Sequence, residues 1–498
     1  MKLIKQLDIV LLLLRCILSF NFIENINSSP NLPCLSSIEG PVIYPDDIRF
    51  QSLIIDYNIR VNYTPSVLIY AINEADVIKA VKCAVNSQNG IIARSGGHSN
   101  EKYGLGGRND TIVLDVTFIN DITVYKDHRN RNVAKIGAGN RLGNVYNKLN
   151  QEGFFIPAGS CPSVGIAGHA LGGGYGFYGR EYGLACDNII SMNMVDAKGN
   201  LLENIESSNH YFDLFFALRG AGGGSYGIVT HFLFEIHPIP ERVTYMSLEF
   251  NAAQVQQLIK AFNEAEINPR LENKTTLRMK LEKKRSILKL SIIGLYLGNR
   301  KRAEAEIDKL LTKTETTHEP KIKPILLEYV EQTFFESVET LATSSEPPSP
   351  LQSKYEVVSP VHNIFKVKTF LVKQGEGLTR KAIDELVKFL NEVPCDTSAT
   401  FELWGGKINH RDDTSSFIHR DVLYCIILTS ETSKEQSTKC VDKINDFGRY
   451  FQSKFTSYYS YQNFIDRDLD DWETSVVTED HENTCKGHMD TLMPRVML

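Results

Sequence analysis

Two glycine-rich stretches of the chain each hold a residue that can form a covalent bond or carry a proton. His98 lies in RSGGHS, and Cys161 lies in PAGSCPSVGIAGHALGGGYG, residues 157–176. A nearby imidazole lowers the pKa of a thiol, so the pair could act in nucleophilic catalysis. No C-x-x-C or H-x-x-x-H spacing accompanies the two residues, so we expect no metal site. Each residue alone is more simply explained as part of a packed core. Neither this explanation nor nucleophilic catalysis accounts for the surrounding glycines.

Glycine-rich loops occur at three places in the first half of the chain. They are RSGGHS, SVGIAGHALGGGYG and LRGAGGGSYGIVT. Such loops expose consecutive backbone N–H groups at close range, which is how proteins hold a pyrophosphate. A fourth stretch, IGAGNRLGNVY at residues 136–146, has the spacing G-x-G-x-x-x-G, one residue longer than the dinucleotide fingerprint. We therefore predict only a strand-to-helix turn there.

The elements that must position these loops divide the chain into two parts. Short apolar runs alternate with helical patterns from about residue 40 to 240, as in VLIYAI followed by EADVIKAVKCAV. From about 241 the glycines become sparse, and strand-like runs such as RVTYMSLEF mix with charged helical runs such as TRKAIDELVKFLNEV. This pattern predicts a second, α+β domain that ends near 440. The helical run STKCVDKINDFGRYFQSKF is expected to return to the first domain.

Length and charge exclude some classes of protein. A chain of 498 residues favours two domains, and a net charge of −6 gives no basic footprint for nucleic acid. Lys2 and Lys5 precede an apolar run, which predicts a secretory signal peptide over residues 1–24. Asp8 and Arg15 interrupt that run, so a short membrane anchor or a buried strand is the alternative. No later stretch reaches the ~20 apolar residues of a membrane span, so we expect no stable membrane insertion.

Cysteines and glycosylation sequons agree with a secreted chain. Most of the nine cysteines lie in apolar or helical contexts, where a small buried side chain is the simpler explanation. In an oxidising compartment we expect one disulfide, between Cys34, just before the first folded segment, and Cys83, in the helical pattern that follows. Sequons of the form N-x-S/T occur at Asn27, Asn62, Asn109 and Asn273.

At the glycine-rich motifs the sequence resembles the berberine-bridge-enzyme-like FAD-linked oxidases, which have a p-cresol methylhydroxylase-type FAD-binding domain. The resemblance is carried by RSGGHS, GSCPSVGIAGHALGGGYGFYGREYGLACDNI and DLFFALRGAGGGSYGIVT, and it extends from about residue 34 to 472. It implies an α+β, two-domain flavoprotein oxidase. We expect the FAD-binding domain at 25–240, a substrate-binding domain with an antiparallel sheet at 241–440, and a C-terminal segment, 441–498, that returns to the FAD domain.

The resemblance also implies roles for individual residues. His98 and Cys161 would both attach covalently to one FAD, at the 8α-methyl group and at the 6-position of the isoalloxazine ring. Val164 falls where the family has an oxygen gatekeeper, and its small side chain resembles that of oxidases. Further cofactor-binding positions implied by the resemblance are Arg94, Ser95, Gly96, Gly97, Ser99, Gly165, Gly168, His169, Gly174 and Ile228. The backbone N–H groups of residues 94–97 would face the pyrophosphate.

The catalytic half of the resemblance has two departures. Trp404 would lie over the flavin, as the aromatic residue of the family's W/Y-G-G strand does. In the family's Y-x-N-Y motif the second tyrosine is the usual proton acceptor, but this chain has Phe464 there, which leaves Tyr461 as a substitute base. The tyrosine that often follows the G-G-H-S loop is replaced by Asn100. Beyond Trp472 the family's closing elements are absent, which affects how the FAD domain is completed.

Together these observations predict a secreted oxidase. It would transfer hydride from a hydroxyl or hemiacetal carbon, in a sugar or oligosaccharide, to covalently bound FAD, and molecular oxygen would be reduced to hydrogen peroxide. Two covalent bonds would hold the flavin ring in place and raise its reduction potential. An oxidative enzyme of secondary metabolism on the same scaffold and a non-catalytic secreted family member are the alternatives. We expect a monomer without a nucleic-acid partner.

Overall fold

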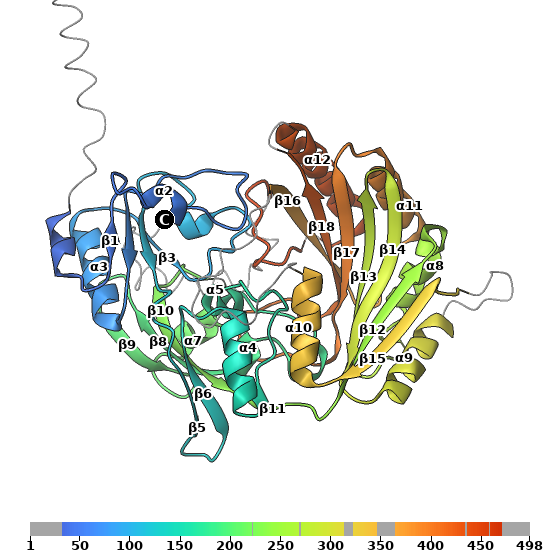
Figure 1. Cartoon of the computed structure of the whole chain (residues 1–498), viewed down its shortest axis with the longest axis horizontal. Helices are drawn as coiled ribbons and strands as arrows, with labels where there is room; N and C mark the ends of the chain where they lie inside the picture. Colours follow the sequence, from blue (N-terminus) through green and yellow to red (C-terminus); the bar gives the residue numbers. More distant parts are fainter. Residues whose placement is uncertain are drawn as a thin grey trace, which may run out of the picture.

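The protein has two domains, which lie side by side in Figure 1. The computed structural model describes residues 32–470 except 222, 268–269, 313–321, 346–363, 434–435 and 458. The expected signal peptide and the tail after 472 lie outside the described residues. No helix within the described part of the chain is long and apolar enough to cross a bilayer. The predicted α+β fold with two domains is confirmed.

The first domain begins with a four-stranded sheet in the order β1-β2-β4-β3. Its central strands are parallel, and helix α3 (Glu74–Asn86) connects β2 to β3. The Asn73 side chain caps this helix by accepting a hydrogen bond from the Asp76 N–H group at 2.9 Å. A disulfide joins Cys34 to Cys83, the predicted pair. The strands are β1 (Val42–Ile43), β2 (Val67–Tyr70), β4 (Ile112–Asp115) and β3 (Ile91–Arg94).

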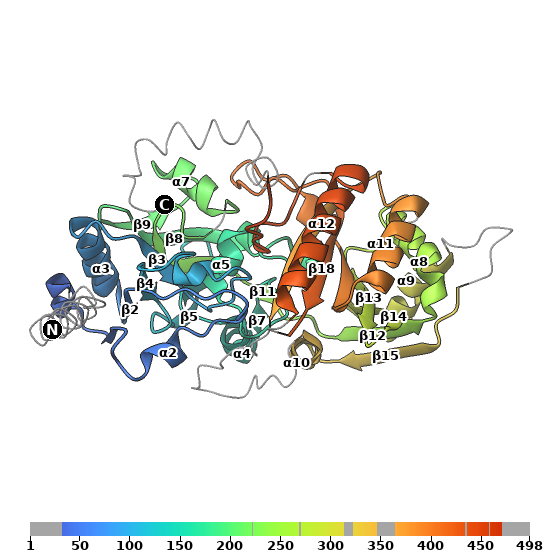
Figure 2. The same ribbon diagram turned by 90° about the horizontal axis from the view of Figure 1, so that it is seen from above.

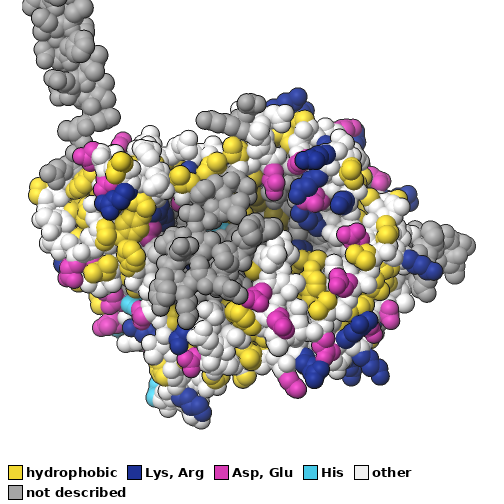
Figure 3. Space-filling view, in the orientation of Figure 1, with side chains coloured by type: hydrophobic (Ala, Val, Ile, Leu, Met, Phe, Trp, Pro, Cys, Tyr) yellow, Lys and Arg dark blue, Asp and Glu magenta, His cyan; other side chains and the backbone are white. Residues whose placement is uncertain are grey.

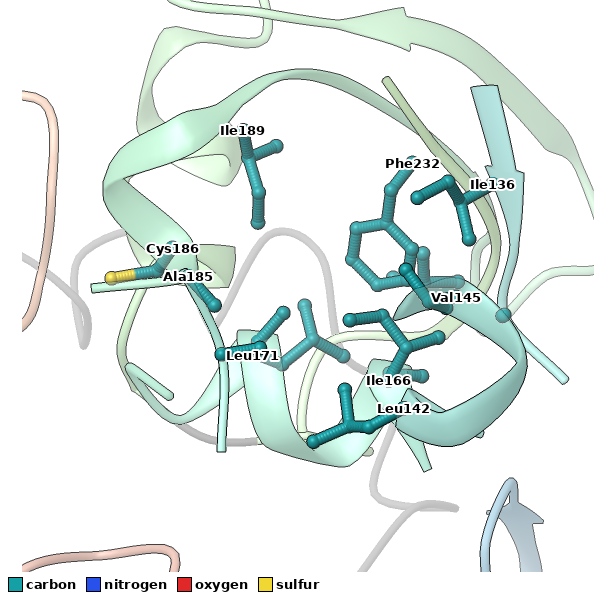
Figure 4. Packing of buried hydrophobic residues seen from close by; sticks show 14 of the residues in the cluster. Ile136, Leu142, Val145, Ile166, Leu171, Ala185, Cys186, Ile189 and Phe232 are labelled. Carbon is teal, nitrogen blue, oxygen red and sulfur yellow. The ribbon is translucent and has the colours of Figure 1, made fainter. Parts of the chain in front are cut away.

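A five-stranded antiparallel sheet completes this domain, in the order β5-β6-β10-β8-β9. Helices α4 (Leu142–Gln151) and α5 (Ile166–Leu171) bury Leu142 and Ile166 in the same cluster as Ile136 and Phe232 of the sheet (Figure 4). Strand β6 ends at Gly137 and α4 begins at Leu142, so the predicted strand-to-helix turn is confirmed. The strands are β5 (Ile122–Lys126), β6 (Asn132–Gly137), β10 (Ile228–Glu235), β8 (Ile189–Val195) and β9 (Leu201–Ile205).

Short elements connect the two sheets and the loops of the first domain. Strands β7 and β11 form a two-stranded sheet beside α4, and α7 precedes the third glycine-rich loop. These elements are η1 (Pro33–Ser37), α2 (Phe50–Leu53), η2 (Tyr103–Leu105), β7 (Phe154–Phe155), α6 (Gly179–Tyr182), η3 (Cys186–Asn188), α7 (Phe212–Leu218) and β11 (His237–Pro238).

The second domain is built on a seven-stranded antiparallel sheet in the order β15-β12-β14-β13-β17-β18-β16. Helices α8, α9, α11 and α12 cover one face, and the opposite face is turned toward the first domain (Figures 1 and 2). The strands are β12 (Val243–Phe250), β13 (Thr275–Lys284), β14 (Ile287–Tyr296), β15 (Leu326–Gln332), β16 (Phe365–Lys373), β17 (Asp396–Leu403) and β18 (Val422–Glu431). The helices are η4 (Ala252–Gln254), α8 (Val255–Asn263), α9 (Arg300–Thr312), α10 (Phe334–Ser345), α11 (Arg380–Glu392), η5 (Gly406–Asn409) and α12 (Ser437–Phe455).

Helix α12 packs on the second domain and not on the first, where the sequence predicted it. We expected it to return to the first domain, but its apolar face packs on the large sheet, where the Phe451 ring lies 5.3 Å from that of Phe370. A second disulfide, between Cys395 and Cys440, fixes its first turn to the start of β17. The buried aromatic side chains of the helix match this sheet, so the chain returns to the first domain only after Phe455. Domain boundaries at 240 and 440 stay predictions.

Charges are distributed without a single dominant sign on the face shown in Figure 3. Acidic and basic side chains are intermixed there over the second domain. Opposite charges so arranged do not add up to a long-range field.

Candidate functional site

The loops that carry His98 and Cys161 lie against each other, backbone to backbone. A Cβ atom on Gly96 would lie 2.2 Å from the Gly165 nitrogen and 3.0 Å from the Ser163 oxygen. A Cβ atom on Gly165 would lie 2.4 Å from the Ser95 hydroxyl oxygen. Only glycine permits this approach. The two residues expected to bind one flavin are therefore carried by loops in direct contact.

His98 follows Gly97, which has a φ of +64° and needs glycine for that conformation. Its imidazole is stacked on the Tyr57 ring, with centroids 3.8 Å apart and planes 18° from parallel. The Tyr57 N–H group donates a hydrogen bond of 3.0 Å to the Gly97 oxygen. Tyr57 therefore fixes both the backbone and the ring plane at His98.

His169, on α5, supports the loop that leads to Cys161. Its Nε2 atom accepts a hydrogen bond of 3.0 Å from the Gly159 N–H group, so this nitrogen is unprotonated. Burial, and then the charge of His98, lower the pKa of His169 to about 4. A Cβ atom on Gly174 would lie 2.9 Å from the His169 ring, which explains the glycine there. A neutral His169 thus holds the backbone two residues before Cys161.

Cys161 is half-buried. The Val164 N–H group donates a hydrogen bond of 3.3 Å to the Cys161 oxygen, so the two residues form a tight turn. Val164 is half-buried and packs against the core of the first domain. The expected gatekeeper thus lies within one turn of the expected attachment residue.

The first glycine-rich loop offers its backbone because its side chains are already engaged. Arg94 donates to Asp115 at 2.6 Å and to the Leu53 oxygen at 2.8 Å, and Ser95 donates to the Ala138 oxygen at 2.7 Å. The Ser99 hydroxyl accepts a hydrogen bond of 3.1 Å from the Tyr103 N–H group. These contacts agree with a pyrophosphate bound by main-chain N–H groups.

A test of whether FAD fits these loops comes from Gly168. This residue is exposed on α5, and a Cβ atom there would meet no atom within 4 Å. The third loop lies opposite, since a Cβ atom on Gly223 would be 3.6 Å from the Gly168 Cα atom. Ile228, which follows that loop, is buried at the start of β10. The glycine-rich walls leave room beside Gly168, so the residues present fit a flavin nucleotide.

An ion pair from the large sheet, between half-buried Arg278 and buried Glu402, completes the site, and the sequence alone did not reveal it. Arg278 on β13 donates to Glu402 on β17 at 2.5 Å, and the two residues face each other in the sheet register. Burial raises the pKa of Glu402 even though the charge of Arg278 opposes the shift. The charges of Glu402, Tyr175 and Cys161 raise the pKa of Arg278 against burial. Glu402 stands two residues before Trp404 in FELWGG, which was the available signal.

Several aromatic side chains pack together near this pair. Trp404 is fully buried, with its ring 5.2 Å from that of Tyr175 and 5.7 Å from that of Tyr461. The Tyr461 hydroxyl oxygen accepts hydrogen bonds of 3.0 Å each from the Gly174 N–H group and from Asn463 Nδ2. Burial raises the pKa of Tyr461. These contacts favour a role for Tyr461 in holding Gly174, while Phe464 packs 5.7 Å away.

Comparison with known proteins agrees with this geometry. Residues 65–204 match the model of an FAD binding domain. The chain is 28% identical over 466 residues to berberine bridge enzyme-like 18 of Arabidopsis thaliana. The alignment covers 89% of this chain and 83% of the relative. It is 32% identical over 256 residues to the chitooligosaccharide oxidase of Gibberella zeae. This alignment covers 51% of this chain and 49% of the relative.

A solved structure shows the same arrangement over most of the chain. Berberine bridge enzyme-like 1 of Physcomitrella patens superposes with a TM-score of 0.83 at 28% identity, covering 94% of this chain and 97% of that one. The matched FAD domain lies within the first domain described above, and the superposition covers both domains. The chain belongs to the berberine bridge enzyme-like family of FAD-linked oxidoreductases.

Proposed function

We propose that this protein is a secreted oxidase of sugars or oligosaccharides whose FAD is bound covalently to both His98 and Cys161. It oxidises a hydroxyl or hemiacetal carbon and reduces oxygen to hydrogen peroxide. The observation that carries the proposal is the contact between the two loops, in which a Gly96 Cβ atom would lie 2.2 Å from the Gly165 nitrogen. Because the loops touch, one ring system between them can reach both side chains.

The bound FAD would supply the acceptor for the hydride that leaves the substrate carbon. The residues of this chain would hold it: the N–H groups of 94–97 would bind the pyrophosphate, and His98 and Cys161 would fix the ring. Neutral His169 keeps the Gly159 backbone in place beside that ring. Two fixed attachments leave the cofactor little freedom to turn away from the substrate, which is how orientation lowers a barrier.

Glu402 is the group that we propose removes the hydroxyl proton. An alcohol must lose its O–H proton as the hydride leaves, and a carboxylate positioned for this task is typically worth 10²–10⁴-fold in rate, about 3–5 kcal/mol. Burial raises the pKa of Glu402 toward the range in which a carboxylate accepts protons well, and Arg278 holds its orientation. Tyr461 is the less suitable base because burial raises the pKa of its hydroxyl, which keeps the group protonated at neutral pH.

A sugar substrate is supported by chemistry and by a relative. Tyr175 is half-buried and close enough to Glu402 for that charge to raise its pKa, after burial. An aromatic ring beside a carboxylate suits a sugar ring, which has an apolar face and hydroxyl edges. The relative that matches half of this chain is named as an oxidase of chitooligosaccharides, which are sugar oligomers.

Secretion is supported by the disulfides. The structure contains Cys34–Cys83 and Cys395–Cys440, one in each domain. Such bonds form and persist in oxidising compartments. With the signal-like sequence at residues 1–24, they favour an extracellular protein, which we propose acts as a monomer.

The test is attachment of the flavin, followed by turnover. Acid-precipitated protein should stay yellow, while a variant with both His98→Ala and Cys161→Ala should release its colour into the supernatant. Flavin extracted freely from the unaltered protein would contradict the covalent assignment. A panel of oligosaccharides and aromatic alcohols assayed for peroxide then separates a sugar oxidase from an enzyme of secondary metabolism. A yellow protein that no member of the panel reduces would favour the non-catalytic alternative.

A further inference from the structure

The loop that carries His98 continues into a junction between the two domains. Asn58 Nδ2 donates hydrogen bonds to the Asn100 oxygen at 2.7 Å and to the Phe365 oxygen at 2.9 Å. Asn100 lies two residues after His98, and Phe365 is the first residue of β16, the edge strand of the large sheet. One side chain therefore links the attachment loop to the substrate-binding domain.

The next residue of the loop, Glu101, is 1% exposed and accepts from three cations. Lys366 of β16 donates to Glu101 Oε1 at 2.8 Å, and Arg467 donates to Oε2 at 2.8 Å. Arg60 also donates to Oε2. These cations come from the first domain, from the large sheet and from the C-terminal segment that follows α12, which passes between the domains in Figure 1.

Lys366 is the centre of this arrangement. Its side chain is 0% exposed and contacts Asp466, as well as Asp468 at 2.7 Å and Glu101. The charges of Asp466 and Glu101 raise the pKa of Lys366, although burial acts in the opposite direction. A buried ammonium group is tolerated only with such partners. We call Arg60, Glu101, Lys366, Asp466, Arg467 and Asp468 the junction cluster.

We propose that the junction cluster positions His98 for its bond to the flavin, so that this bond forms efficiently only when the large sheet and residues 466–468 are docked. Glu101 and Lys366 are positioning residues, since they act through the loop and not on the flavin. The proposal rests on the proposed function, because it requires covalently bound FAD. Tyr57 adds a second constraint by stacking on His98 at 3.8 Å.

The bond itself has a simple balance. His98 gives up its N–H proton and a flavin C–H bond is lost as the C–N bond forms, with oxygen taking the two electrons and two protons as hydrogen peroxide. Attack of this kind needs the nitrogen within close range and correctly aimed, so a displacement of about 1 Å reduces its rate strongly. The Cys161 loop is also held by contacts outside the His98 loop, namely the hydrogen bond from the Gly159 N–H group to His169 and the hydrogen bond from the Tyr146 hydroxyl to the Ala158 oxygen. Weakening the junction cluster should therefore reduce attachment at His98 more than at Cys161.

The experiment compares two substitutions of buried lysines in the same sheet. Lys366→Met removes the centre of the junction cluster. Lys283→Met is the matched control, because Lys283 is 9% exposed on β13 and donates to the Val393 oxygen, away from the attachment loop. Proteolysis and mass spectrometry of the flavin-bearing peptides measure the fraction of flavin bonded to His98, to Cys161 and to both. Thermal unfolding shows how far each substitution destabilises the fold.

We expect Lys366→Met to lower the His98-bonded fraction at least tenfold relative to the unaltered protein, while bonding to Cys161 remains. Lys283→Met should keep both bonds. Equal fractions in the two variants would overturn the proposal. Should Lys366→Met fail to fold, Glu101→Gln replaces it, with the same expected loss at His98 and the same contradicting result. Absence of any flavin-bearing peptide from the unaltered protein would refute the proposed function instead, and this inference with it.

Discussion

Arg278 and Glu402 face each other across β13 and β17 and share a hydrogen bond of 2.5 Å on the sheet face turned toward the FAD domain. The pair is held by strand register, which fixes both Cα atoms, and not by a flexible loop. Removing one charge of such a pair typically lowers the stability of the fold, so a substitution at either residue should keep the size of the side chain and its hydrogen bond. The pair is also the point where a proton acceptor would be needed in the proposed reaction.

Glu402→Gln should slow reduction of the flavin by substrate by 10²–10⁴-fold, the typical contribution of a positioned base. Glutamine keeps the size of the side chain and can still accept from Arg278, but it cannot take the proton. Burial raises the pKa of Glu402. As the solution is acidified, the reduction rate of the unaltered protein should therefore begin to fall at a higher pH than it would with an ordinary carboxylate as base. Anaerobic stopped-flow measurements over a pH series test both points.

The matched control for this substitution is Glu282→Gln, which removes a glutamate of β13 paired with Lys280 at 2.7 Å. It should leave the reduction rate unchanged. Tyr461→Phe should also change the rate little, but it should lower stability by about 1–3 kcal/mol, because the buried Gly174 N–H group loses its acceptor. A large rate loss in Tyr461→Phe with none in Glu402→Gln would reverse the assignment of the base.

Val164→Leu should slow the reaction of the reduced enzyme with oxygen by about tenfold, which corresponds to ~1.4 kcal/mol of barrier. The residue is half-buried in the turn after Cys161, so an added methylene group would narrow the approach to the proposed position of the flavin ring. Reduction by substrate should be nearly unchanged. Val124→Leu, a half-buried position on β5, serves as the control and should change neither step. Equal slowing of both steps in Val164→Leu would exclude a gating role.

His169 should make the protein less stable in acid. Its pKa is about 4 in the folded protein and 6.5 in the unfolded chain, so the unfolded chain binds the proton first as the pH falls. The stability contributed by neutral His169 is therefore complete above about pH 6.5 and is lost as the pH falls toward 4. A shift of this size corresponds to at most about 3 kcal/mol, less because the ring is partly exposed.

Thermal unfolding at pH 7 and pH 4.5 measures this effect. His169→Gln keeps an acceptor for the Gly159 N–H group but does not titrate, so its unfolding temperature should fall less on acidification. His210→Gln, an exposed histidine of the same domain, should behave as the unaltered protein does. The same acid-induced fall in all three proteins would show that His169 is not responsible.

The sequence contains local information, and the local predictions are the ones that hold. The apolar run VLIYAI became β2, the helical pattern EADVIKAVKCAV became α3, and the G-x-G-x-x-x-G stretch became a turn between β6 and α4. Each of these depends on neighbours within one element. The glycine-rich motifs around His98 and Cys161 could also be recognised as those of an FAD-binding domain, because they are long and specific.

What the sequence did not reveal depends on pairing between distant segments. Arg278 and Glu402 are 124 residues apart, and only the sheet register brings them together. The junction cluster likewise needs residues from three parts of the chain. Helix α12 was assigned to the wrong domain because an amphipathic pattern shows that a helix buries one face but not against which sheet.

Gly168→Ala tests where the flavin lies. A Cβ atom there meets nothing within 4 Å in the protein, and alanine favours a helix over glycine by about 1 kcal/mol, so the fold should be as stable as before or slightly more so. If the flavin occupies the open space beside α5, the added methyl group should lower the FAD content, measured by absorbance against protein. Gly96→Ala is the contrasting variant, because its Cβ atom would collide with the Gly165 backbone, and it should lose both stability and FAD. A Gly168→Ala protein with normal stability and full FAD content would place the flavin away from α5.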